Sequence, residues 1–335
     1  MNILFLRGQE PQDRDPKETY YNSLEDCDDM WTHLANALTE QTGIGEILYW
    51  NGDRKVHYTN RFTEKRIKTF EGYKPSFTPD VIFARGGFSE YDYIIKSFPK
   101  TIKIYYGAHA KRFFPQDDKV YYDIIFVDSQ EQKSIVSEKF PNSYVTLFIK
   151  STVENIMFPH KVKKEYDVCF PANGSQKKFK EHEWVFSTAP KDLKILNLGN
   201  TSGLSVPSHI TSYKVNRKAI AKEYSKCRVG IVCCNKDLDS CPRVLPEMLA
   251  CNIPVVCTNT FHFWSDLYMN KDTGILVNKE TLWDAVRYTL KNVERFKPRT
   301  FYEKNLSIKK SVEHIKEHLY YFANKTQKER LSNGC

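Results

Sequence analysis

The sequence predicts an α/β protein made of two doubly wound lobes. Short apolar runs alternate with amphipathic stretches along the chain, and this alternation is typical of βαβ units that form a parallel sheet. The alternation starts again after a charged connector, FPHKVKKEY at 158–166. A chain of 335 residues with 41% apolar residues fits two domains of ordinary size better than one. We expect one lobe over residues 1–158 and a second lobe over residues 159–306.

In the first lobe, apolar runs bounded by Gly, Pro, Asp or Lys predict buried strands. They are Ile3–Leu6, Ile47–Trp50, Val81–Ala84, Ile102–Tyr106, Ile124–Val127 and Tyr144–Phe148. Between the first two strands, apolar residues recur at spacings of three and four over Asp28–Thr39, which predicts a helix.

The same pattern predicts the strands of the second lobe and a helix at the end of the chain. The expected strands are Asp167–Pro171, Leu193–Leu198, Val229–Cys233 and Ile253–Cys257. From Ile308 to Phe322, apolar residues step by four and three, which predicts an amphipathic helix that needs an apolar surface. We expect this helix, within 307–325, to pack back onto the first lobe.

The composition bears on the cellular location of the protein and on the state of its cysteines. The opening MNILFL is too short for a secretory core, and no stretch approaches the roughly 20 apolar residues of a membrane span. These features predict a cytoplasmic protein. Nine scattered cysteines contain no CxxC pair and no neighbouring His at zinc spacing, so we expect reduced, mostly buried thiols and no metal site.

The formal net charge of +9 favours anionic partners. A nucleotide diphosphate, an anionic membrane surface touched peripherally, and DNA are three candidates. A solvated, lysine-rich surface explains the same charge without a partner.

The segment Val229–Asn259 predicts a buried strand, a polar loop, a short helix and a second buried strand. Pro246 lacks an amide hydrogen, so it belongs in the first turn of the helix, with Ser240 or a neighbour as the cap. Asp239 is then on the loop and Glu247 is near the helix start. This is the carboxyl edge of the sheet, where open α/β folds bind ligands.

These residues carry a resemblance to a known family. Asp239 and Glu247, with seven residues between them and MLACNIPVV after them, resemble the E-x7-E donor signature of retaining glycosyltransferases with the two-lobed GT-B fold. The match is closer to the subgroup of CgeB-like proteins, through Pro242, Arg243, Val244, Glu247, Leu249, Ala250, Cys251 and Pro254. Weaker matches at 103–115, 121–141 and 148–159 follow in the family's order, and the resemblance covers most of residues 80–300.

The resemblance implies roles for several residues. Glu247 would accept hydrogen bonds from the ribose hydroxyls of the donor. Asp239, where the family usually has Glu, would hold the transferred sugar or stabilise positive charge at its anomeric carbon. His109 would lie in the cleft between the lobes near the reacting sugar. The group expected around the donor diphosphate comprises Asn173, Gly174, Lys177, Lys178 and Arg243, because the family's usual clamp arginine is missing.

The implied activity is transfer of a hexosyl or pentosyl group from a UDP- or GDP-sugar to an acceptor hydroxyl, with retention and without a metal. No permanently bound cofactor is expected, and the acceptor is a glycan, a lipid-linked glycan or modified DNA. Two alternatives stay open: a nucleotide-sugar epimerase of the same fold, and a binding protein that has lost transfer. The sequence contains no P-loop, no G-x-G-x-x-G and no nucleophile elbow, which argues against kinases, dehydrogenases and hydrolases.

Overall fold

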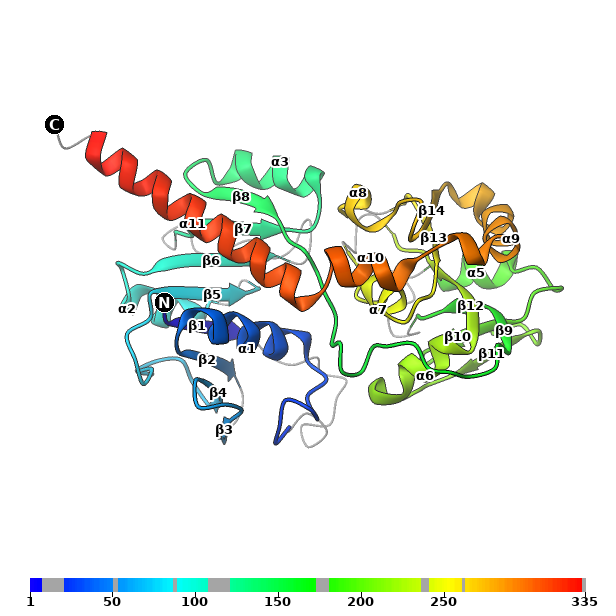
Figure 1. Ribbon diagram of the computed structural model, residues 1–335, viewed down its shortest axis with the longest axis horizontal. Coiled ribbons are helices and arrows are strands. Elements are labelled where there is room, and N and C mark those ends of the chain that lie inside the picture. Colours follow the sequence, from blue (N-terminus) through cyan, green and yellow to red (C-terminus); the bar gives the residue numbers. More distant parts are fainter. Residues whose placement is uncertain are drawn as a thin grey trace. The chain divides into compact units, whose positions relative to one another are not determined.

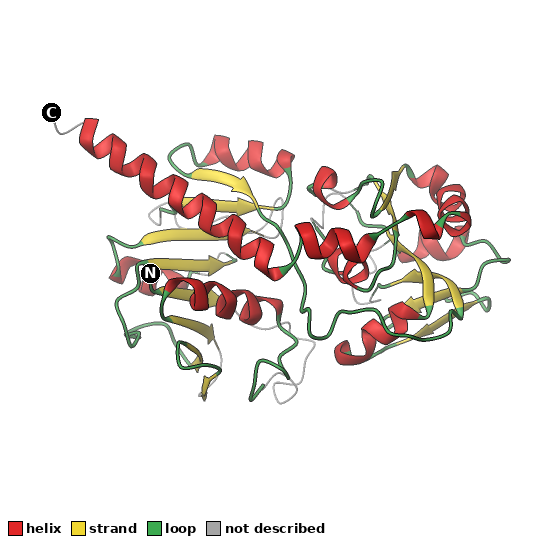
Figure 2. Cartoon of the chain, viewed as in Figure 1, coloured by secondary structure: helices red, strands yellow, loops and turns green. Residues whose placement is uncertain are grey.

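The chain forms two compact units, each an α/β structure in which helices pack on a mainly parallel sheet (Figures 1 and 2). The computed structural model describes residues 1–7, 21–50, 54–86, 89–107, 121–172, 181–235, 241–260 and 263–332. Unit 1 consists of Met1–Ile149 and Ile308–Cys335, and unit 2 consists of Lys150–Ser307. The end of the chain thus returns to the first unit.

The sheet of unit 1 has eight strands in the order β3-β4-β2-β1-β5-β6-β7-β8. All neighbours pair in parallel except β3 and β4, which pair antiparallel. The strands are β1 (Ile3–Arg7), β2 (Gly45–Trp50), β3 (Arg54–His57), β4 (Phe62–Ile67), β5 (Val81–Arg85), β6 (Ile102–Gly107), β7 (Ile124–Val127) and β8 (Tyr144–Leu147).

The helices of unit 1 are α1 (Met30–Thr42), α2 (Tyr91–Ser97), α3 (Gln130–Lys139) and α11 (Ile308–Ser332). Asp29 caps α1 by accepting from the Thr32 amide at 3.1 Å, and Ser129 caps α3 in the same way. Helices α1 and α11 lie side by side over one face of the sheet (Figure 1). On that face His314 of α11 hydrogen-bonds the Leu147 carbonyl oxygen at 2.7 Å, so α11 is fixed to the end of β8.

The sheet of unit 2 has six strands, all parallel, in the order β11-β10-β9-β12-β13-β14. They are β9 (Tyr166–Phe170), β10 (Ile195–Leu198), β11 (Ile210–Tyr213), β12 (Cys227–Val232), β13 (Val255–Thr258) and β14 (Gly274–Val277). Numbered along unit 2, this order is 3-2-1-4-5-6, which is that of a Rossmann domain. The helices are α5 (His182–Thr188), η3 (Arg217–Ala219), α6 (Ile220–Ser225), α7 (Val244–Ala250), α8 (Ser265–Tyr268), η4 (Lys279–Thr281), α9 (Leu282–Lys291), η5 (Val293–Arg295) and α10 (Pro298–Asn305).

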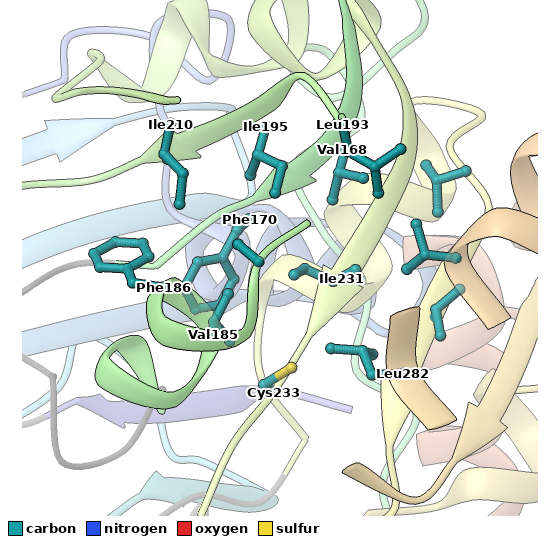
Figure 3. Packing of buried hydrophobic residues seen from close by; sticks show 14 of the residues in the cluster. Val168, Phe170, Val185, Phe186, Leu193, Ile195, Ile210, Ile231, Cys233 and Leu282 are labelled. Carbon is teal, nitrogen blue, oxygen red and sulfur yellow. The ribbon is translucent and has the colours of Figure 1, made fainter. Parts of the chain in front are cut away.

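The core of unit 2 lies between the sheet and helices α5 and α9. Figure 3 shows apolar side chains of β9, β10 and β12 together with those of the two helices, among them Phe170, Ile195, Ile231, Val185 and Leu282. Helices α6 and α7 cover the opposite face, where Met248 of α7 packs directly over Gly230 of β12. A Cβ atom at Gly230 would lie 2.3 Å from the Met248 sulfur, so glycine allows α7 to approach the sheet this closely.

The predicted fold class, two doubly wound α/β lobes, is confirmed. Four strands have no counterpart in the sequence prediction: β3, β4, β11 and β14. In β4 the inward positions hold Glu64 and Arg66, which are buried as an ion pair, so the apolar alternation that predicts a strand is lost. Strands β11 and β14 are four residues long and lie at the edges of their sheet, where little burial is required.

No helix in the described ranges has both the length and the apolar character to cross a bilayer. The cysteines in the same ranges are all buried thiols not joined in disulfides, as the sequence predicted.

Candidate functional site

Unit 2 has a topological switch point between β9 and β12. From β9 the strand order runs one way through β10 to β11, and from β12 it runs the other way through β13 to β14. The connections that leave the carboxyl ends of two such strands part to opposite faces of the sheet, and ligands of open α/β folds bind between them. The segment after β9 contains Asn173, Gly174, Lys177 and Lys178, and the segment after β12 contains Asp239.

Residues 173–180 and 236–240 lie outside the described residues, but the structure shows where both segments resume. The first resumes at Glu181, whose carboxylate lies 2.7 Å from the Lys279 ammonium nitrogen. Glu181 has φ of 54°, a left-handed conformation that is uncommon for a residue other than glycine. Residues in such strained conformations cluster at functional sites. The backbone of Glu181, where the segment after β9 ends, is therefore consistent with a site there.

The second segment resumes at Cys241, whose carbonyl oxygen accepts a hydrogen bond from the buried ammonium group of Lys150. Tyr268 fixes Lys150 in turn, since its hydroxyl accepts from the Lys150 amide at 2.7 Å and lies 3.0 Å from the Lys150 carbonyl oxygen. Lys150 therefore places a positive charge at the end of the segment that carries Asp239.

Glu247 lies in the first turn of α7 and is 2% exposed. One carboxylate oxygen, Oε1, is 2.8 Å from a guanidinium nitrogen of Arg217. The other oxygen, Oε2, accepts a hydrogen bond from the Tyr224 hydroxyl at 3.3 Å. Burial, followed by the charge of Glu247, raises the pKa of Tyr224 well above its ordinary value, so Tyr224 stays protonated and donates.

Arg217 and Tyr224 join three elements around this carboxylate. Arg217 is the first residue of η3, which Asn216 caps by accepting from the Lys218 amide at 2.9 Å, and Tyr224 is fully buried in α6. A carboxylate has about four lone-pair positions; the Tyr224 hydrogen bond uses one of them, and the contact of Oε1 with Arg217 is an ion pair without a hydrogen bond. Glu247 is therefore held in one orientation and keeps the capacity to accept from a ligand.

Arg243 is exposed and is the N-cap residue of α7, without a side-chain capping bond of its own. Pro246 is the third residue of α7 and lies in its first turn, as the sequence predicted. The predicted cap Ser240 lies outside the described residues, and so do Asp239, His109, Lys177, Lys178, Asn173 and Gly174. The structure thus places Glu247 and Arg243 on one short helix after β12, and the other site residues stay predictions.

Sequence reasoning missed Arg217, Tyr224 and Lys150. Arg217 and Tyr224 belong to no motif, and Lys150 lies in the matched segment 148–159 without a role implied for it; each meets the site only through the tertiary fold. Within the described residues, no three His, Cys, Asp or Glu side chains gather as metal ligands.

Comparison with known proteins shows which solved structures share this fold. No family model matches the sequence, and no curated protein matches it. Solved structures do match. The chain is similar to sucrose-phosphate synthase from Thermosynechococcus elongatus, with TM-score 0.70, 11% identity and coverage of 96% of this chain and 99% of that one. It is also similar to a glycosyltransferase from Rickettsia africae, with TM-score 0.65, 14% identity and coverage of 96% and 98%.

A third similar structure is Alr3699/HepE from Anabaena, solved in complex with UDP, with TM-score 0.63, 10% identity and coverage of 96% and 100%. Together with the two Rossmann-like sheets, these likenesses identify the architecture as the GT-B fold. At such low identity the likeness concerns the fold, and function depends on the site.

Proposed function

We propose that the chain is a glycosyltransferase that takes a sugar from a nucleotide-diphosphate sugar and binds this donor in unit 2. The observation that carries the proposal is the switch point between β9 and β12, since the segments leaving both strands hold the residues that donor binding needs. Structures of the same fold support it, because one holds UDP and another, a trehalose-6-phosphate protein from E. coli, holds UDP-2-fluoro glucose.

In this proposal Glu247 accepts hydrogen bonds from the two ribose hydroxyls of the donor. Arg217 and Tyr224 act as positioning residues, since they fix the carboxylate through one contact on each oxygen. A carboxylate held in place before binding loses less conformational entropy when the ligand arrives.

The leaving diphosphate needs positive charge and backbone amides around it. We assign this task to Asn173, Gly174, Lys177, Lys178 and Arg243, and we add Lys150, whose ammonium group lies at the end of the segment that carries Asp239. Asp239 and His109 act on the transferred sugar. Transfer with retention, independence of a metal and a UDP or GDP donor are parts of the proposal, as are an acceptor-binding role for unit 1 and membership of the CgeB-like subgroup.

Nucleotide binding by the full chain tests the donor site directly. A ligand present at about 100 times its dissociation constant adds about 2.7 kcal/mol to the free energy of unfolding. We expect UDP or GDP to raise the unfolding temperature, and we expect release of free nucleotide from one nucleotide-sugar in the presence of an acceptor. Turnover of the donor without any acceptor would indicate an epimerase instead, and binding without turnover would indicate a binding protein.

Glu247→Gln is the first informative variant, because it keeps the size of the side chain and removes its charge. Hydrogen bonds to charged groups contribute about 1.5–3 kcal/mol, so we expect the dissociation constant of the nucleotide to rise about ten- to hundredfold by calorimetry. Glu294→Gln, an exposed glutamate in the same unit, is the matched control and should bind normally. Equal affinities in wild type and Glu247→Gln would refute the assigned role.

A further inference from the structure

Three arginines lie in one row across the carboxyl edge of the unit 1 sheet. Arg66 of β4 pairs in register with Tyr49 of β2, Tyr49 with Arg7 of β1, and Arg7 with Arg85 of β5. Residues in register on neighbouring strands point to the same face of a sheet. We call Arg66, Tyr49, Arg7 and Arg85 the arginine row. It lies on the face that α1 covers, because Trp31 of α1 packs against the row.

Aromatic rings orient the three guanidinium groups. The centres of the Arg7 and Arg66 groups lie 5.2 Å and 5.0 Å from the centre of the Tyr49 ring. The Arg85 group lies 5.1 Å from the Trp31 ring. These distances are within the range of cation–π attraction, so each side chain is held in place at the strand end.

Like charges directly opposite on neighbouring strands repel each other, so this arrangement has a cost in stability that the fold must offset. Asp29, the cap of α1, accepts hydrogen bonds from Arg7 and, at 2.9 Å, from the Tyr49 hydroxyl. Burial raises the pKa of Asp29, but the charge and hydrogen bond of Arg7 and the charge of Arg85 outweigh it and hold the pKa well below its usual range. Asp29 therefore stays ionised and stabilises both arginines.

The three arginines differ in accessibility. Arg66 is 5% exposed and pairs with the buried Glu64 at 3.1 Å, so it serves the fold. Arg7 and Arg85, at the last positions of β1 and β5, are both partly exposed. Arg7 and Arg85 therefore keep part of their surface open on the same face of the sheet, whereas Arg66 is buried.

Strands β1 and β5 also form the topological switch point of unit 1. From β1 the order runs through β2 to β4, and from β5 it runs through β6 to β8. Arg7 and Arg85 are thus the terminal residues of the two strands between which an open α/β sheet binds its ligand.

We propose that Arg7 and Arg85 bind an oxyanion group, a phosphate or a carboxylate, of a second small-molecule ligand of this chain. Guanidinium groups present planar pairs of N–H donors that match both oxyanions, and two such groups side by side supply several charge-assisted hydrogen bonds. If the proposed sugar transfer holds, this ligand is the acceptor, and that identification rests on the proposed function. The binding site itself does not depend on it.

The test uses the full chain with inorganic phosphate and acetate as probes, at constant ionic strength and with saturating UDP to block any phosphate binding at the donor site. Thermal unfolding is followed as each probe is raised through the millimolar range, and an apparent dissociation constant is fitted. We expect a saturable rise in unfolding temperature with at least one probe. Stabilisation by phosphate and not acetate would assign a phosphorylated ligand, and the reverse would assign a carboxylate.

Arg85→Lys is the informative variant, because it keeps the charge that Asp29 balances and removes the planar fork. We expect at least about a tenfold weaker affinity for the probe in this variant. Arg61→Gln removes an exposed arginine at the amino end of β4, at the opposite edge of the same sheet, and should bind like wild type. Arg85→Gln also removes the charge, so we expect it to weaken probe binding further. Its unfolding temperature without probe shows whether this variant still folds.

Probe affinities within twofold of each other in wild type and Arg85→Lys would overturn the proposal, as would no saturable stabilisation of the wild type. Both outcomes are independent of the donor site. Failure of both UDP and GDP to bind would refute the function proposed for unit 2, yet phosphate or acetate would still stabilise unit 1.

Discussion

At the scale of the residue, Arg217 and Glu247 form a pair in which Glu247 is the candidate ligand-binding group and Arg217 stabilises its buried charge. A buried carboxylate needs a compensating charge, and Arg217 supplies it at 2.8 Å. The sequence identifies Glu247 by its position near the start of a helix after a buried strand. It gives no sign of Arg217, because the two residues share no element and meet only where α6, which contacts both η3 and α7, brings them together.

Breaking this pair should destabilise unit 2. Arg217→Met removes the charge and keeps most of the length, leaving Glu247 buried without its partner, and such changes cost about 3–5 kcal/mol. We expect a loss of this order in denaturant unfolding, and a smaller loss in Arg217→Met/Glu247→Gln, where the carboxylate is also neutral. Arg295→Met, an exposed arginine in another 3-10 turn, should change stability by less than about 0.5 kcal/mol. Equal losses in the single and double variants would contradict an uncompensated buried carboxylate as the cause of the loss.

At the scale of the element, helix α7 owes its position to the contact between Gly230 and Met248. The helix is seven residues long, and its buried side chains include Leu245, Met248 and Leu249. Because Glu247 precedes Met248, the depth at which Met248 packs on β12 also sets the position of the carboxylate.

Gly230→Ala should therefore push α7 outward. The new Cβ atom would lie 2.3 Å from the sulfur of Met248, and overpacking of this kind costs about 1–3 kcal/mol, with methionine flexibility favouring the lower part of the range. We expect the double variant Gly230→Ala/Met248→Ala to be less destabilised than the sum of the two single variants in a denaturant-based cycle. Additive effects would contradict the direct contact. If Glu247 holds the donor, Gly230→Ala should also weaken nucleotide binding.

At the scale of the whole molecule, the chain leaves unit 1, completes unit 2 and returns as α11. Two histidines hold this last helix on the sheet. His314 bonds the Leu147 carbonyl oxygen, and the ring nitrogens of His318 lie 2.9 Å from the Tyr144 hydroxyl and 3.3 Å from the Thr146 hydroxyl. The centres of the two imidazole rings are 4.4 Å apart, so protonation of one ring disfavours protonation of the other.

These contacts predict loss of stability in mild acid. Burial, and then the neighbouring His314, lower the pKa of His318 from 6.5 to about 4. The unfolded chain takes up this proton first as the pH falls, so the stability from His318 is complete above pH 6.5 and is lost between pH 6.5 and about 4. Since His318 is partly exposed, solvent reduces the effect, and we expect a loss of about 1 kcal/mol, or about 2–4 °C in Tm. His318→Gln should show a flatter pH dependence over this range, and an unchanged dependence would contradict the assignment.

Much of the fold was predictable because both sheets are mainly parallel, and their central strands are buried on both faces. In such sheets each central strand is a continuous apolar run, as in Ile124–Val127 and Val229–Cys233, so local sequence is sufficient to find it. Strand β4 was not predictable, because Glu64 and Arg66 look exposed in sequence and are buried as a pair. The position of Pro246 in the first turn of α7 was predictable, since proline restricts its own backbone whatever surrounds it.

The sequence by itself determined the fold class, the central strands of both sheets and the place of Glu247 near a helix start, because apolar periodicity and helix-start chemistry act between near neighbours in the chain. Only the tertiary structure decided that Arg217 and Tyr224 meet Glu247, that Lys150 reaches Cys241, and that Arg7 stands beside Arg85. The physical reason is that strand order and register bring together side chains that are distant in sequence, and no local pattern records which strand becomes the neighbour of which.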